Sequence, residues 1–120
     1  MKKGIVVILI SFLIVSSCSK SSDGGNGGGG GGNTNCNGVP NAFAANVSPT
    51  IQTSCATDAS CHGAGSVHGP GPLLIYSQIF NARVAIKTSV GNGTMPKTGT
   101  LTTAQKNSII CWVDGGAPNN

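Results

Sequence analysis

Apolar residues recur at helical spacing where the C-terminal part of the chain begins. Phe43, Val47 and Ile51 lie four residues apart, which places them on one face of a helix. Ser48 and Pro49 supply a helix start, because serine is a good N-cap and a proline at the first helical position has no N–H to leave unpaired. The pattern predicts a first helix that begins at Ser48 and runs towards residue 55.

A second helical pattern covers about residues 76–86. The segment before it, residues 63–72, contains four glycines and two prolines, so we expect a loop there. Apolar side chains then recur every three or four residues and predict a helix with one buried side. This side comprises Ile75, Ile79, Ala82 and Ile86, and is widened by Phe80 and Val84.

A third helix has the clearest predicted boundaries. Thr102 and Gln105 fit a capping box, and the glycines at 115–116 end the helix. Ile109, Trp112 and Val113 share its apolar face. No segment shows convincing alternation with a period of two, so the pattern predicts an all-α domain built on three helices.

The first residues of the chain have the pattern of an export signal. Lys2 and Lys3 precede an apolar run, Ile5–Val15, that is too short to span a bilayer comfortably. Small residues then lead into Cys18, which resembles the lipobox of bacterial lipoproteins and implies cleavage before Cys18 and acylation of this cysteine. We therefore expect a signal peptide at residues 1–17. The alternative is an ordinary signal peptide with an incidental cysteine.

Residues 18–35 are dominated by glycine and small polar residues. Such a segment cannot bury enough apolar surface to offset the entropy of ordering it, so we expect a flexible tether. Residues 36–120 remain as one small domain, of a size at which a cofactor or a disulfide commonly adds stability. These features predict an exported protein that is lipid-anchored to a bacterial membrane, on its periplasmic face or at the cell surface.

Charge narrows the function further. The formal net charge of +4 includes Lys2 and Lys3, so the remaining chain is only weakly basic and offers no nucleic-acid surface. The acidic residues after the signal peptide are Asp23, Asp58 and Asp114. No carboxylate pair and no nucleophile–base arrangement can be traced, so we do not expect an enzyme.

The cysteines are informative because export permits disulfides. The chain has five, and assigning Cys18 to the lipid leaves an even number. Cys111 lies about 200° around the third helix from Ile109, away from the main apolar face. There it can meet the segment that enters the first helix, so we expect a Cys36–Cys111 disulfide that ties the two ends of the domain. Two free buried thiols are the alternative.

Cys55, Cys61 and His62 form the main candidate site. Attachment of a c-type haem needs two thiols and an imidazole, with the second thiol and the imidazole adjacent in sequence. The spacer of five small residues is longer than usual and must bulge outward. Two alternatives remain open: a Cys55–Cys61 disulfide with His62 on the surface, and a zinc site that adds His68, although adjacent ligands suit a tetrahedral centre poorly.

Met95, followed by Pro96, supplies a possible second ligand in a glycine-rich loop. A thioether is a soft ligand that favours Fe(II). A lone methionine more often fills a gap in a core, but this one lies in a polar segment. His68 is an alternative sixth ligand, although an exposed loop histidine explains it as well.

Together these motifs resemble the small class I-type cytochrome c domains of exported bacterial proteins. The resemblance covers residues 36–120 and is closest in the segment MPKTGTLTTAQKNSIICWVDGGAPNN. It implies a covalent haem c, one per chain, with thioethers at Cys55 and Cys61. It also implies His62 and Met95 as axial ligands, with Trp112 packed against the first helix or the haem edge.

The function that the resemblance implies is single-electron transfer outside the cytoplasm, with redox proteins as partners and the membrane reached through the lipid anchor. Two other functions remain possible from the sequence. One is a haem-free, disulfide-stapled surface lipoprotein that acts as an interaction module. The other is a haem-based sensor or a peroxidase-like site, which requires that Met95 is not a ligand. The cytochrome interpretation predicts a cleft between His62 and Met95.

Overall fold

The computed structural model describes residues 34–120 and contains helices and loops, with no strand in this range. The elements are a π-helical segment η1 (Phe43–Val47), α1 (Ser48–Ser54), α2 (Tyr76–Gly91) and α3 (Thr103–Asp114). The all-α prediction is confirmed. The predicted signal peptide, the Cys18 lipid site and the tether up to residue 33 lie outside the described residues. Within residues 34–120, no helix combines the length and the apolar character needed to cross a membrane.

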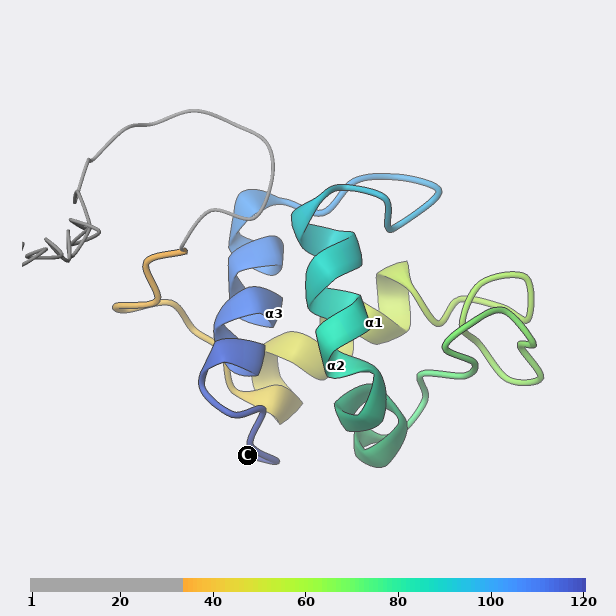
Figure 1. Ribbon diagram of the computed structural model, residues 1–120, viewed down its shortest axis with the longest axis horizontal. Helices are drawn as coiled ribbons and strands as arrows, with labels where there is room; N and C mark the ends of the chain where they lie inside the picture. The colour runs from red at the N-terminus through yellow and green to blue at the C-terminus, as the bar shows by residue number, and fades with distance from the viewer. Residues whose placement is uncertain (1–33) are drawn as a thin grey trace, which may run out of the picture.

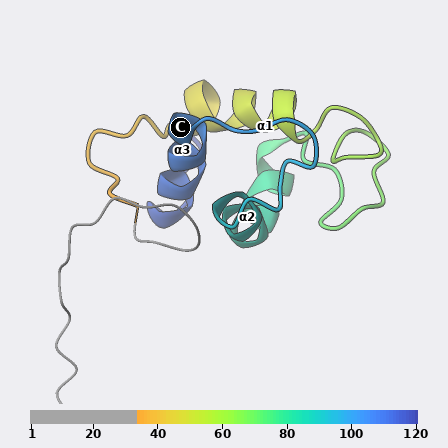
Figure 2. The same ribbon diagram turned by 90° about the horizontal axis from the view of Figure 1, so that it is seen from above.

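α2 and α3 lie side by side, and η1 and α1 run in succession across one face of this pair (Figures 1 and 2). The apolar faces of the helices meet in one core, in which Ile51, Ile79 and Ile109 are fully buried. The long loop of residues 56–72 projects on the side opposite residues 34–40 (Figure 1). α2 therefore has α3 on one side and the loop of residues 56–72 on the other (Figure 1).

The start of the first helix differs from the prediction. Helical structure begins at Phe43 rather than Ser48, and Ser48 itself has helical backbone angles, so it is not an N-cap. The first turns are π-helical, with the Ser48 N–H donating to the Phe43 carbonyl. The ring of Pro49 would clash with the carbonyl four residues before it in a regular α-helix, and a wider turn relieves this crowding. The predicted apolar face of Phe43, Val47 and Ile51 is buried, as expected.

The free N–H groups at the start of η1 are capped from the other end of the domain. The Phe43 N–H donates to the side-chain Oδ1 of Asn120 over 2.8 Å. The Ala44 N–H donates to the backbone oxygen of Asn120, also over 2.8 Å. A helix start of this kind has no local N-cap signal in the sequence, because its acceptors lie far away in the chain.

α2 extends beyond the predicted residue 86 to Gly91, and Val90 adds to its buried side. Two residues assigned to the apolar side are exposed: Ile75 by 58% and Val84 by 65%. Ile75 is the N-cap and has an extended backbone, so helical spacing does not govern its direction. Val84 lies about 200° around the helix from the buried Ile86, which turns it to solvent.

α3 matches its prediction closely. Thr102 is the N-cap, and its hydroxyl accepts from the Gln105 N–H over 3.2 Å. The Gln105 side chain accepts from the Thr102 N–H over 2.9 Å, which completes the capping box. Ile109 and Trp112 are fully buried, and Val113 is half-buried. The helix ends at Asp114, before the two glycines.

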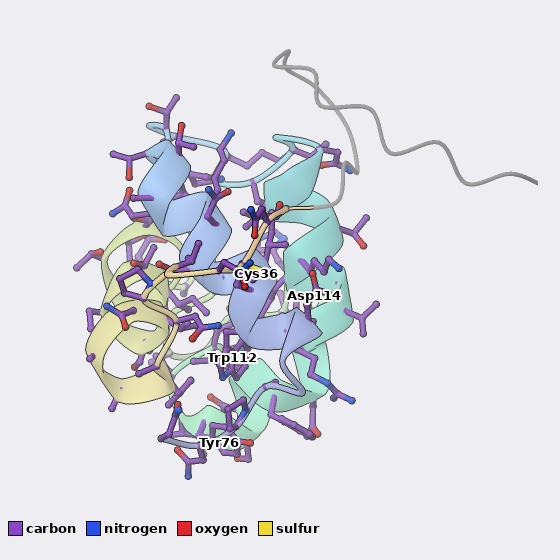
Figure 3. All side chains as sticks on the ribbon, turned by 90° about the vertical axis from the view of Figure 1, so that its left-hand side faces the viewer. Cys36, Tyr76, Trp112 and Asp114 are labelled. Carbon is purple, nitrogen blue, oxygen red and sulfur yellow. A yellow bond between two sulfur atoms is a disulfide. The ribbon has the colours of Figure 1, made fainter. Side chains whose placement is uncertain are left out.

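An aromatic cluster joins η1, α2 and α3. The ring of Phe43 lies 5.5 Å from that of Trp112 and 4.9 Å from that of Tyr76. The chain after α3 adds two hydrogen bonds, from the Trp112 indole to the Pro118 carbonyl and from the Tyr76 hydroxyl to the Ala117 carbonyl, both 2.8 Å. Trp112 therefore packs against the first helix, one of the two positions that the sequence suggested (Figure 3).

The predicted Cys36–Cys111 disulfide is present. The two residues lie 75 positions apart in the chain, with their Cα atoms separated by 5.5 Å. Cys36 lies over α3, above the region of Trp112 and Tyr76 (Figure 3). The bridge fastens the segment before η1 to the last helix.

Candidate functional site

A pocket of about 150 Å³ brings His62 and Met95 together. His62 comes from the loop after α1, and Met95 from the loop between α2 and α3. The second half of α2 forms the wall between these loops, with Ile86, Ser89 and Val90 facing the pocket. The lining is mainly apolar and includes Leu73 and Pro70. The cleft that the sequence predicted between His62 and Met95 is thus found at this position.

His62 is held with one ring nitrogen free. The residue is 7% exposed, and its Nδ1 lies 3.0 Å from the carbonyl oxygen of Gly71. Because a carbonyl oxygen only accepts, Nδ1 must carry the hydrogen and donate it. The lone pair of the neutral ring is then on Nε2. A hydrogen bond from the other nitrogen is the usual way in which proteins set the tautomer of a ligating histidine.

The backbone of His62 is fixed on both sides. Its N–H donates to the Cys55 carbonyl at the end of α1 over 2.9 Å. Its carbonyl accepts from the Leu73 N–H over 2.8 Å. The ligand candidate is therefore tied to α1 and to the segment that leads into α2, although it lies in a loop.

The spacer between Cys55 and Cys61 is an ordered turn built on Asp58. The Asp58 side chain accepts from the Ser60 N–H over 2.8 Å and from the Ser60 hydroxyl over 2.5 Å. These hydrogen bonds to the ionised form lower the pKa of Asp58. The spacer residues after Ala56 are exposed, so the expected outward bulge is present and has a defined shape.

Residue 63 has to be a glycine because the backbone passes very close to Asp58 at this position. Its N–H donates to the Asp58 carbonyl over 2.7 Å. A Cβ at residue 63 would lie 2.7 Å from the carbonyl carbon of Asp58, closer than real contacts allow. The glycine after His62 therefore lets the chain pass directly beside Asp58.

The two cysteines of the site have different surroundings. Both are free thiols, so the alternative of a Cys55–Cys61 disulfide does not describe this structure. Cys55 is 8% exposed and belongs to the apolar core, whereas Cys61 is half-buried. Burial, together with the nearby Cys61, raises the pKa of the Cys55 thiol. Neither thiol lines the pocket, but both flank the turn that delivers His62.

Met95 is half-buried and lies apart from the core cluster. Its N–H donates to the Ser89 carbonyl over 3.1 Å, which ties the loop back to the last turn of α2. The side chain faces the same pocket as His62. Met95 is thus a half-buried residue of the pocket lining and is not one of the buried core residues.

His68, the alternative sixth ligand, and Arg83, the only arginine of the chain, both lie outside the pocket lining. His68 is exposed, and residues 34–120 contain no group of three His, Cys, Asp or Glu side chains placed to hold a metal ion, so the predicted zinc alternative lacks its ligand set. The guanidinium of Arg83 lies 4.0 Å from the centre of the Phe80 ring and donates to the Phe80 carbonyl.

The donor set fits the chemistry of a c-type haem. An imidazole with a free Nε2 and a thioether are one of the axial pairs found at haem iron. Two free thiols precede the imidazole, as thioether attachment requires. The mainly apolar lining suits a macrocycle that is to be kept from water.

Sequence reasoning missed the residues that orient His62. Gly71 appeared only as part of a loop, and Gln52 only as a helical position. Gln52 donates to the Leu73 carbonyl over 2.9 Å, and no pattern in the sequence indicates a hydrogen bond over this separation. Asp58 was detectable, since an aspartate side chain often accepts from the backbone N–H two residues further on and so forms a turn.

No protein-family model matches the chain, and no significant similarity links it to a curated protein or to a solved structure. The resemblance to cytochrome c therefore rests on the motifs, and a functional proposal has to be argued from the site itself.

Proposed function

We propose that this chain is a mono-haem c-type cytochrome that carries single electrons outside the cytoplasm. The observation that carries the proposal is the meeting of His62 and Met95 at one pocket. The two residues come from separate loops, and a histidine and a methionine are the ligand pair found in cytochromes c. Two further observations support it: the hydrogen bond of the His62 ring is made by Nδ1, and Met95 is not one of the buried core residues.

In this proposal, Nε2 of His62 and the thioether sulfur of Met95 would hold the haem iron, and Cys55 and Cys61 would attach the macrocycle. The bound haem supplies a one-electron couple between Fe(II) and Fe(III). Leu73, Ile86 and Val90 line the pocket with apolar side chains, which would shield a bound macrocycle from water. The thioether of Met95 stabilises the reduced state and so sets a higher potential than a second histidine would.

With both His62 and Met95 as ligands, the iron would have no open position for a substrate, which favours an electron carrier over an enzyme. The partners are then redox proteins that approach one exposed edge of the site. Export and anchoring to a bacterial membrane through acylated Cys18 belong to the same proposal and rest on the sequence alone.

The test is an absorption spectrum of the reduced full-length protein, produced together with a haem-attachment system. A c-type spectrum supports the proposal. The haem should also stay on the protein after extraction with acidified acetone, which removes haem that is not covalently attached, and should then give the pyridine adduct of a c-type haem. A colourless protein contradicts it and favours the disulfide-stapled interaction module.

Replacement of Met95 separates the carrier from a sensor or a peroxidase-like site. If Met95 is the sixth ligand, Met95→Ala removes the sulfur–iron charge-transfer band of the oxidised protein and opens the iron to added imidazole or cyanide. An oxidised spectrum that is unchanged by Met95→Ala excludes Met95 as a ligand. Substitution of the exposed Val67 by alanine is the control, since Val67 is 92% exposed and does not line the pocket.

A further inference from the structure

The segment 71–74 holds His62 at two points. The ring Nδ1 of His62 donates to the Gly71 carbonyl over 3.0 Å, and the Leu73 N–H donates to the His62 carbonyl over 2.8 Å. The orientation of the imidazole therefore depends on where this short irregular segment lies. Any group that fixes the segment also fixes the direction of the ring.

The side chain of Gln52, which is half-buried on α1, extends from this helix to the segment. Its Nε2 lies 2.9 Å from the Leu73 carbonyl and 3.4 Å from the Leu74 carbonyl. Both partners are carbonyls and only accept, so the amide must present its NH₂ group to them. Leu73 is thus held on both sides, by His62 at its N–H and by Gln52 at its carbonyl.

We infer that Gln52 is a positioning residue for the His62 ligand, acting through Leu73 and Gly71. This inference rests on the proposed function for the consequence at the iron. The buried Leu73 side chain also anchors the segment. Apolar packing has little directional preference, however, whereas a hydrogen bond sets the direction of a carbonyl and of the peptide that carries it.

The expected consequence concerns the basicity of the imidazole. A hydrogen bond from the second nitrogen of a ligating histidine makes the ring a stronger electron donor. A loosened Gly71 contact therefore weakens the donation and disfavours Fe(III) relative to Fe(II). Loss of the Gln52 donors shifts the midpoint potential to a higher value, without removing any residue that touches the iron.

Gln52→Met tests this inference, because it keeps the length of the side chain and removes both donors. In the reduced holoprotein, the exchange of the His62 Nδ1 hydrogen with solvent should become about fivefold faster, which corresponds to one net hydrogen bond of ~1 kcal/mol. The midpoint potential should rise in the same variant. Thr53→Ala is the matched control on α1, since the Thr53 hydroxyl bonds only to carbonyls of its own helix.

Gln52→Lys provides a second measurement, because an ammonium group keeps a donor at similar reach. Its Nδ1 exchange should stay near that of the wild type, and this comparison decides the matter if Gln52→Met fails to fold. A wild-type exchange rate and potential in Gln52→Met, or a fivefold acceleration in Gln52→Lys, would overturn the inference.

The proposed function can fail separately. If the wild-type protein binds no haem, the tautomer of His62 in the haem-free chain is read from the ¹⁵N shifts of the ring. A single Nδ1–H tautomer in the wild type, with a mixture in Gln52→Met, then supports the positioning role. The same mixture in both proteins contradicts it.

Discussion

Two titratable residues near His62 have pKa values that their surroundings shift in opposite directions. Cys55 lies in the core, and loss of hydration raises the pKa of its thiol. Asp58 lies in solvent, and hydrogen bonds from Ser60 lower the pKa of its carboxyl. One residue is thus kept neutral by burial, while the other is kept charged by donors. Both effects can be measured in the haem-free protein.

Cys61 should react with iodoacetamide before Cys55 does. The thiolate is the reactive form, and Cys55 is both buried and shifted towards the neutral thiol. The measurement is peptide mass spectrometry of the haem-free protein after short exposure at pH 8. Cys61→Ser should leave only slow labelling at Cys55. Equal initial rates at the two thiols would contradict this prediction.

Asp58 should make stability depend on acid pH. Its pKa in the folded state is lowered, so its contribution is present above the ordinary aspartate pKa of about 3.9 and is lost as the pH falls through the folded value. Asp58→Asn should therefore melt below the wild type at pH 7, and the difference should shrink at pH 2–3. In Ser60→Ala, the Asp58 pKa measured by NMR should move back up. A gap in melting temperature that is independent of pH would disagree.

At the level of elements, the helices supply walls and the loops supply the chemical groups. α2 provides one wall of the pocket, but His62 lies before it and Met95 after it. α1 contributes through its end, where the Cys55 carbonyl accepts from the His62 N–H. Residues 92–102, which include Met95, connect α2 to the N-terminal cap of α3 (Figure 1).

The cap of α3 gives a prediction at this scale. Thr102→Ala removes the hydroxyl that accepts from Gln105 and should lower the free energy of unfolding by about 1 kcal/mol. Thr103→Ala, one position further along and also exposed, should change it by less than about 0.5 kcal/mol. Urea denaturation followed by circular dichroism provides both values. An equal loss in the two variants would mean that the cap has no specific role.

For the molecule as a whole, the ties between the chain ends lie away from the pocket. The Cys36–Cys111 disulfide, the Asn120 cap on η1 and the hydrogen bond from Ser108 to the Pro40 carbonyl join residues near the two ends of the domain. The loop of residues 56–72 projects on the opposite side (Figures 1 and 2). We therefore expect that mutations of these ties change stability and leave the candidate site intact.

Removal of the disulfide should destabilise the domain without altering the pocket. For a loop of 75 residues, the chain-entropy model gives roughly 4–5 kcal/mol. The double variant Cys36→Ala with Cys111→Ala should therefore show a large loss in urea denaturation. The fraction that remains folded should keep the His62 tautomer and any haem spectrum of the wild type. A changed spectrum in the folded fraction would show that the bridge and the pocket are coupled.

The sequence by itself determined the features that are local or periodic. The capping box at Thr102, the buried faces around Ile51, Ile79 and Ile109, and the all-α class follow from neighbours in the chain. The Cys36–Cys111 pairing could be predicted because the helical position of Cys111 turned it towards the segment that enters the first helix.

Only the tertiary structure decided how these pieces meet. The helix start at Phe43 depends on acceptors from Asn120, and the orientation of His62 depends on Gly71 and Gln52. The burial of Cys55 was likewise not evident from its motif. Contacts of this kind join atoms that are distant in the chain, and a hydrogen bond over such a distance leaves no spacing or period in the sequence by which it can be found.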